Sequence, residues 1–330
     1  MSMDRRTPGP VVALGLALIL VAAACNPAAS PDASSSPNVS GPTGACTASP
    51  EVDSAPGWEK PSTTPAVIPI IVSSFQACGT NRFVFTLIDA GNVPVAAPDI
   101  AVTVAFFDLG RDAARPVAMV DADFVWAIEG SRGAYVANVD YPSHGTWGAE
   151  FRTTSPGQPE AVVRVSFTVR EIAPTIAVGQ PAPASKTLTL ADVGGDIARL
   201  STDGEPLAAM YETSVATAVA EHRPFLLAFA TPKFCASAQC GPTLDRVKPF
   251  VAGYPTVTFI NVEPYELEVV DGQLQPVLTD NQLTTVPALS EWGLVSEPWI
   301  FVVDRAGVVR GSFEGIVRTE ELAAALDSVR

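Results

Sequence analysis

The chain has 330 residues and is acidic: 35 Asp and Glu outnumber 20 Lys and Arg, for a formal net charge of −15. An acidic chain is a poor ligand for nucleic acid and is repelled by anionic lipid headgroups, and no Lys/Arg cluster overcomes this. We therefore expect no nucleic-acid partner. The hydrophobic content of 47% is enough for packed cores, and the length suggests one large or two ordinary domains after the N-terminal segments.

The N-terminus has the anatomy of an export signal. Two arginines precede an apolar run, Val11 to Ala23, that is too short to be a spanning helix, and small residues then lead to Cys25. This arrangement resembles the lipobox of bacterial lipoproteins, although Ala22 stands where that family prefers leucine. The resemblance implies a signal peptide over residues 1–24 and a lipid on Cys25 that holds the protein on the extracytoplasmic face of the cell membrane. The alternative is an ordinary secretory signal with an incidental cysteine.

Residues 25–64 are predicted to be a disordered tether. The segment consists of Pro, Ser, Ala, Thr and Gly with almost no large apolar residue, so it cannot bury enough apolar surface to offset its ordering entropy. Its prolines favour an extended chain. Such a tether suits a folded part that is held near a membrane.

The chain has five cysteines, and a lipid on Cys25 would leave an even number. Cys235 and Cys240 are close in sequence. By elimination, Cys46 and Cys78 are expected to form a structural disulfide that pins the tether to the first folded segment. The alternative is two free thiols, which suit an exported protein less well.

Residues 65–171 show the pattern of an antiparallel β-sandwich, because short β-branched or aromatic runs alternate with turn clusters. The predicted strands are Ala66–Ser73, Arg82–Leu87, Ile100–Phe107, Phe124–Ile128, Gly133–Val139, Gly145–Arg152 and Ala161–Val169. The segments Gly133–Ala137 and Gly145–Gly148 resemble the end of small immunoglobulin-like modules in bacterial envelope proteins. That resemblance implies an immunoglobulin-like sandwich and identifies no ligand.

A linker is predicted over 172–178, because this stretch carries Ala-Pro-Thr and leads into Gly-Gln-Pro-Ala-Pro. A mixed helix-and-strand pattern follows over 179–330, so the chain is predicted to be multidomain. The first expected element is a helix from Pro206, with Leu207, Tyr211, Val215 and Val219 on one face. Two strands, Phe225–Ala230 and Thr256–Val262, follow on either side of the helix Leu244–Val251. After them we expect a helical segment, the hairpin Trp299–Asp304 with Val308–Phe313, and a last helix capped by Thr319. The strand–helix–strand order implies parallel pairing, and the closing hairpin makes the sheet mixed.

The cysteine pair carries the most specific resemblance. The strand from Phe225 runs through a short turn into Cys235, as in redoxin-type thioredoxins, where an active-site cysteine opens a helix after an apolar strand. Pro298 resembles the family's cis proline, which faces the cysteines, and Val178–Pro183 resembles the family's opening segment. The resemblance covers about residues 179–330 and implies a thioredoxin-like fold with Cys235, Cys240 and Pro298 in the active site.

The spacing of the two cysteines departs from the family, since four residues rather than two separate Cys235 from Cys240. Two residues five positions apart on a helix point in directions that differ by about 140° around the helix axis. A disulfide therefore needs one cysteine off the helix or a distorted first turn. We favour the register in which Cys235 is the active thiol, but Cys240 takes that role if the helix starts late, because Pro242 suits a first helical turn.

Three functions follow from these patterns. The first is a membrane-tethered thiol–disulfide oxidoreductase without a cofactor, acting on extracytoplasmic protein thiols or disulfides. The second is a non-enzymatic envelope lipoprotein in which the Cys235–Cys240 disulfide is structural and the fold binds a partner; Glu297 favours it, because a nearby carboxylate opposes a thiolate. The third is a copper chaperone of the kind that places two cysteines on this fold. That function needs a histidine ligand, but His222 lies just before the Phe225 strand and matches no ligand position of those chaperones. His144 lies in a predicted turn of the other domain, so we expect no metal site.

Overall fold

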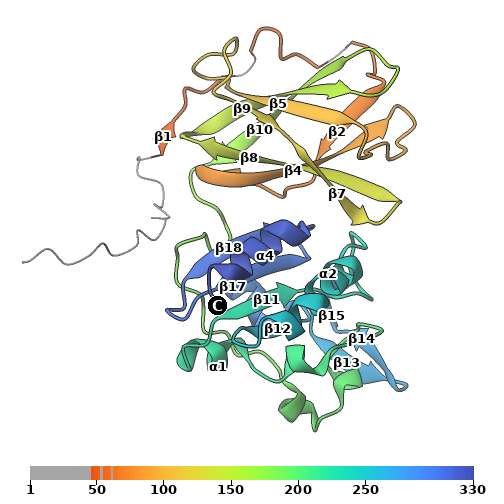
Figure 1. Cartoon of the computed structure of the whole chain (residues 1–330), viewed down its shortest axis with the longest axis vertical. Helices are drawn as coiled ribbons and strands as arrows, with labels where there is room; N and C mark the ends of the chain where they lie inside the picture. The colour runs from red at the N-terminus through yellow and green to blue at the C-terminus, as the bar shows by residue number, and fades with distance from the viewer. Residues whose placement is uncertain (1–45, 53–54, 61) are drawn as a thin grey trace, which may run out of the picture. The chain divides into compact units, whose positions relative to one another are not determined.

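The computed structural model describes residues 46–52, 55–60 and 62–330 (Figure 1). Its secondary structure is 38% strand and 16% helix. The predicted signal peptide, Cys25 and the first part of the predicted tether lie outside the described residues. Within the described ranges, no helix has both the length and the apolar character needed to cross a bilayer.

Residues 67–170 form two facing β-sheets. One has the strand order β2-β4-β8-β7 and the other β3-β10-β9-β5-β6, with β1 paired to the start of β9. Each of the seven predicted strands overlaps an observed one, while β1, β3 and β6 were not predicted. The strands are β1 Thr47–Ala48, β2 Val67–Ile71, β3 Gln76–Ala77, β4 Gly79–Asp89, β5 Ala101–Asp108, β6 Ala118–Asp121, β7 Asp123–Ile128, β8 Arg132–Tyr141, β9 Ser143–Thr154 and β10 Ala161–Arg170.

Aromatic side chains fill the space between the two sheets. Phe83 and Phe85 of β4 meet Phe106 of β5 and Phe151 of β9, with ring centroids 5.1 Å apart for Phe83–Phe106 and 4.9 Å for Phe85–Phe151. Residues two apart on a strand share a face, which is why alternate aromatic positions meet in one core. The described first half of the chain is therefore a β-sandwich.

The folded part begins earlier than the sequence pattern indicates. A disulfide joins Cys46 to Cys78, and the two residues after Cys46 form β1, which pairs in parallel with β9. Trp58 donates its indole N–H to the carbonyl of Ala113 at 3.0 Å and packs edge-on against Phe107. The composition of residues 25–64 predicted a tether, but one tryptophan and one disulfide hold its described second part against the sandwich.

The second half contains a four-stranded mixed sheet of order β12-β11-β17-β18. Strand β11 is parallel to β12, and β17 forms an antiparallel hairpin with β18, as the element order predicted. The antiparallel pairing of β11 with β17 was not predicted. The elements are β11 Phe225–Phe229, α2 Cys240–Gly253, β12 Thr258–Val262, α3 Pro287–Glu291, β17 Trp299–Val303, β18 Val309–Glu314 and α4 Thr319–Asp327. The short α1, Val215–Ala220, precedes them.

Helices cover both faces of this sheet. Leu226 and Ala228 of β11 share a core with buried residues of α2 and α4. The alternate residues Phe225, Leu227 and Phe229 share a second core with α1 and α3. All five residues of β11 are fully buried, which explains why the strand is a continuous apolar run rather than an alternating one.

Three elements differ from the prediction. The amphipathic stretch after Pro206 is not one helix: a 3₁₀ turn, Ala208–Tyr211, is followed by α1, whose first turn is capped by Ser214 accepting from the N–H of Thr217 at 3.1 Å. The N-cap of α4 is Arg318 rather than Thr319. The segment after β12, expected to be helical, contains two hairpins and only the one short helix α3: β13 Leu267–Val270 pairs with β14 Gln273–Pro276, and β15 Leu278–Thr279 pairs with β16 Gln282–Leu283.

Candidate functional site

A disulfide joins Cys235 and Cys240, whose Cα atoms are 6.1 Å apart. Cys240 is the first residue of α2, and Cys235 lies in the irregular turn that follows β11. The pair therefore bridges a loop and a helix start, which is how five-residue spacing becomes compatible with a disulfide. Cys235 is half-buried, whereas Cys240 has no exposed surface.

The sulfur of Cys235 faces the N-terminal end of α2. It accepts the backbone N–H of Cys240 at 3.3 Å and lies 3.3 Å from the hydroxyl of Ser237. The first N–H groups of a helix have no partner within the helix, and the helix dipole is positive at this end. Both effects favour negative charge on the Cys235 sulfur once the disulfide is opened.

The loop between the cysteines lies against the segment before β17. Ser237 donates its hydroxyl to the carbonyl of Glu297 at 3.4 Å, and the N–H of Ala236 is 3.5 Å from Oε1 of the same residue. The Glu297–Pro298 peptide bond is cis, as the resemblance implies, and Pro298 is buried. The structure thus brings Cys235, Cys240 and the Pro298 segment together.

Tyr265 was not singled out from the sequence. It donates its hydroxyl to Oε2 of Glu297 at 2.9 Å. Burial and the Glu297 carboxylate raise the pKa of Tyr265, so it stays protonated and continues to donate at neutral pH. Nothing in the sequence marks this contact, because 32 residues separate the two side chains.

A buried polar network lies where β11 and β12 end. Asn261 of β12 donates to the hydroxyl of Tyr211 at 3.1 Å, and that hydroxyl is 2.7 Å from Ser201. Beside it, Oε1 of Glu263 accepts from the N–H and the hydroxyl of Thr202 at 2.6 and 2.7 Å. The same Thr202 hydroxyl accepts the N–H of Lys233, two residues before Cys235, at 3.3 Å. The network therefore fixes the start of the cysteine loop.

Glu263 is the buried carboxyl of this network. Burial raises the pKa of Glu263 above its ordinary value of 4.5, although hydrogen bonds from Thr231 and Thr202 oppose the rise. Its folded-state pKa exceeds its unfolded-state pKa, so the folded protein binds the extra proton between the two values. The free energy of unfolding contributed by this group is highest below about pH 4.5 and falls as pH rises through the folded-state pKa.

We expect Glu263→Gln to become more stable relative to the wild type as pH rises between about pH 5 and about pH 8. The amide keeps an acceptor for Thr202 and carries no charge to bury. Denaturant unfolding at a series of pH values measures this. Glu266→Gln removes the same charge at an exposed position and is the matched control. Parallel pH profiles for Glu263→Gln and the wild type would contradict the argument.

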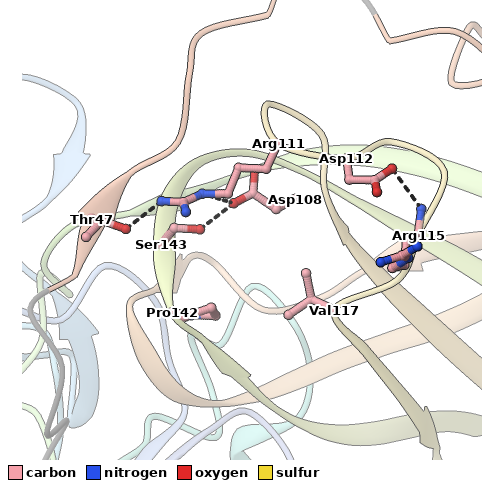
Figure 2. A pocket seen from close by; sticks show the side chains of 8 residues that line it. All are labelled: Thr47, Asp108, Arg111, Asp112, Arg115, Val117, Pro142 and Ser143. Atoms are coloured by element: carbon pink, nitrogen blue, oxygen red, sulfur yellow. Dashed lines mark hydrogen bonds and ion pairs between the residues drawn. The ribbon is translucent and has the colours of Figure 1, made fainter.

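A small cavity lies on the sandwich (Figure 2). The cavity measures about 120 Å³, room for a few waters, and is lined by Thr47, Asp108, Arg111, Asp112, Arg115, Val117, Pro142 and Ser143. The buried Asp108 accepts hydrogen bonds from Ser49 and Ser143 and pairs with Arg111 at 3.1 Å. Arg111 also donates to Thr47 of β1 at 2.6 Å. These polar groups satisfy one another, so this cavity joins β1 to the sandwich and is the weaker candidate site.

The histidines do not meet the cysteines. His144 lies in β9, paired with Ala48, rather than in a turn. His222 precedes β11, whereas Cys235 follows it, and five strand residues span about 16 Å. Among the described residues, no group of three or more His, Cys, Asp or Glu side chains could hold a metal ion.

Comparison with known proteins identifies no family for this chain. No family model matches it, and no curated protein matches it. Two similar solved structures are a DUF4426 family protein from Pseudomonas aeruginosa PAO1, at 14% identity and a TM-score of 0.24, and MtrC from Shewanella baltica OS185, at 15% identity and a TM-score of 0.23. The first match covers 32% of this chain and 91% of that protein, and the second covers 35% of this chain and 24% of that protein. Likenesses this weak carry no argument about function.

Proposed function

We propose that residues 179–330 form a thioredoxin-like domain that exchanges disulfides with protein thiols through Cys235 and Cys240. The observation that carries the proposal is the position of the half-buried Cys235 in the turn after β11, with its sulfur 3.3 Å from the first backbone N–H of α2. The contacts of the cysteine loop with Glu297, next to Pro298, support it further.

The helix starts late, at Cys240, a position that by itself would favour Cys240 as the active thiol. Burial favours the other assignment, because Cys240 has no exposed surface and Cys235 is only half-buried. We therefore take Cys235 as the attacking thiol and Cys240 as the resolving one. In the reduced pair, the Cys235 thiolate attacks one sulfur of a partner disulfide; the partner's S–S bond breaks, its other sulfur leaves as a thiolate and takes a proton, and a mixed disulfide forms on Cys235. The Cys240 thiolate then attacks Cys235, which releases the second partner thiol and closes the Cys235–Cys240 disulfide. The partner gains two electrons and the pair loses two, and the reverse sequence oxidises a partner dithiol.

A structural disulfide with a binding role is the second candidate. Two observations favour it: Cys240 is completely buried among apolar side chains, and the Glu297 carboxylate lies against the loop that contains Cys235. A nearby carboxylate disfavours thiolate and so slows exchange.

The reduction potential of the Cys235–Cys240 pair separates the two candidates. A structural disulfide should lie below about −300 mV, whereas an exchanging pair should lie between about −270 and −120 mV. The measurement equilibrates the protein with dithiol buffers and quantifies the reduced fraction by thiol alkylation at each cysteine. We expect a value in the higher range. A potential below that range would favour the structural role.

We propose further that the protein is held outside the cytoplasm by a lipid on Cys25, because small residues precede this cysteine and a polar segment follows it. Disulfides in the structure are in keeping with an oxidising compartment. We expect Cys25→Ser to release the protein from the membrane fraction or to block its processing. Membrane fractionation and the mass of the mature N-terminus measure this. Unchanged fractionation together with normal processing would refute the anchor.

A further inference from the structure

Two hairpins between β12 and α3 lie next to the segment that leads to Cys235. The Lys233 ammonium, two residues before Cys235, donates to the carbonyl of Leu274 in β14 at 3.1 Å. Tyr265, just before β13, donates to the Glu297 carboxylate at 2.9 Å, and the same carboxylate lies 3.5 Å from the N–H of Ala236 in the cysteine loop. A polypeptide bound on the first hairpin would therefore lie near Cys235.

The two hairpins form one connected unit. Besides the β13–β14 and β15–β16 pairing, the N–H of Val277 donates to Glu266 at 2.9 Å, the N–H of Thr284 donates to Val277 at 2.9 Å, and the N–H of Glu266 donates to Thr284 at 2.8 Å. These bonds join the start of β13 to both strands of the second hairpin. The unit is held by its backbone, so its outward-facing side chains have a defined arrangement.

Apolar side chains of this unit remain exposed. Val270 of β13 exposes 43% of its surface, and Leu278 of β15 and Leu283 of β16 expose 56% and 36%. Val269 is also exposed, but as the neighbour of Val270 on the strand it points to the opposite face, that of the buried Leu274. Leu278 and Leu283 are direct cross-strand partners, so their side chains lie on one face. Single exposed apolar residues are common on protein surfaces, but a group of them on neighbouring strands is typical of an interaction surface.

The ionisable side chains of this unit are all acidic. No Lys or Arg occurs in residues 249–304, although the whole chain has 20 of them. Exposed carboxyls on the hairpins are Glu266, Glu268, Asp271 and Asp280. The Lys233 ammonium borders the unit but is bound to the Leu274 carbonyl. An anionic partner would be repelled here, and a cationic one would be attracted.

We propose that this hairpin surface, made of Val270, Leu278 and Leu283 with the carboxyls of Glu266, Glu268, Asp271 and Asp280, docks a cationic polypeptide segment with apolar side chains and presents its cysteine to Cys235. The apolar contacts supply affinity, and the carboxyls select the sign of the partner's charge. This inference rests on the proposed function and names the class of partner for the same site.

Docking can be measured apart from exchange. The oxidised full-length protein is titrated with three short fluorescent peptides in which serine replaces the cysteine: one with Lys and Leu residues, one with Glu in place of Lys, and one with Ser in place of Leu. We expect the Lys/Leu peptide to bind at least about tenfold more tightly than either of the others. Its affinity should fall between about 0.1 M and about 1 M salt, because screening weakens the charge attraction. Equal affinity for the Lys and Glu peptides would overturn the proposal.

Two variants locate the binding on the hairpins. Leu278→Gln with Leu283→Gln removes apolar contact, and Glu268→Gln with Asp280→Asn removes charge while keeping similar shape. Each pair should weaken the Lys/Leu peptide about fivefold or more. Met119→Gln with Asp99→Asn makes the same kinds of change on the exposed sandwich surface and should have no effect. Wild-type affinity in both hairpin variants, with folding verified by circular dichroism, would overturn the proposal.

Cysteine-containing versions of the same peptides, supplied as disulfides, separate this inference from the proposed function. Selective docking without exchange would mean that the disulfide chemistry is absent while the surface still binds. Exchange that ignores peptide charge and is unchanged in the hairpin variants would support the chemistry and overturn the docking surface. We expect exchange that is faster for the Lys/Leu peptide and slower in both hairpin variants.

Discussion

Cys240→Ser should convert a transient intermediate into a stable product: a mixed disulfide between Cys235 and the partner. In this variant the half-buried Cys235 can still attack, because its sulfur keeps the helix-end N–H at position 240. The resolving thiol is gone, so the intermediate persists. Incubation of the reduced variant with a disulfide-containing peptide, followed by non-reducing mass spectrometry, should find the peptide linked to Cys235.

Cys235→Ser is the matched control for this experiment. It leaves Cys240, which has no exposed surface, as the only thiol of the pair. We expect exchange in this variant to fall to the rate of the uncatalysed reaction, with no peptide trapped. Trapping through Cys240 with none through Cys235 would reverse the assignment of roles, and no trapping in either variant would favour a structural disulfide.

Replacing both Cys46 and Cys78 with serine should lower the free energy of unfolding by about 3 to 4 kcal/mol, the loop-entropy value for a cross-link between residues 32 apart. The disulfide holds residue 46 beside the strand pairing of β1 with β9. Without it, the segment up to Trp58 is held only by non-covalent contacts, among them the two-residue strand pairing, the Thr47–Arg111 hydrogen bond and the packing of Trp58 on Phe107. Denaturant unfolding measures the loss.

Limited proteolysis of the same double variant tests where the loss arises. Cleavage should increase within residues 46–60 and not within α2, whose own disulfide is intact. The wild type, mapped as peptides without reductant, should give the linked Cys46–Cys78 pair. An unchanged free energy of unfolding, or two free thiols in the exported wild type, would contradict a structural role for this pair.

Some site residues could be predicted from the sequence and others could not. Cys235, Cys240 and Pro298 were predicted because a short apolar strand, a turn and a cysteine form a local pattern, and a proline before a second apolar strand is also local. Tyr265 and Glu263 were not, since each acts through a contact with a residue far away in the sequence: Tyr265 with Glu297, and Glu263 with Thr202.

The sequence by itself determined the elements whose signal lies within a few neighbouring residues. Alternating β-branched and aromatic residues predicted the seven main sandwich strands, and the continuous apolar runs at Phe225 and Trp299 predicted the buried strands of the mixed sheet. In these segments the side-chain pattern needed for burial coincides with the intrinsic preference of the residues for strand.

Only the tertiary structure decided the elements that depend on distant contacts. The polar composition of residues 46–60 predicted a tether, but Trp58 packs against Phe107 of the sandwich. The stretch from Leu207 to Val219 has helical spacing, yet Tyr211 turns its hydroxyl toward Ser201 and Asn261, and a new helix starts after Ser214. The sequence did not decide whether α2 starts at Cys235 or near Cys240, because the residues around either start are compatible with a helix N-terminus. In the structure α2 starts at Cys240 and Cys235 lies outside the helix. Packing against the sheet selects the later start, since it buries Cys240 among apolar side chains and leaves Cys235 half-buried.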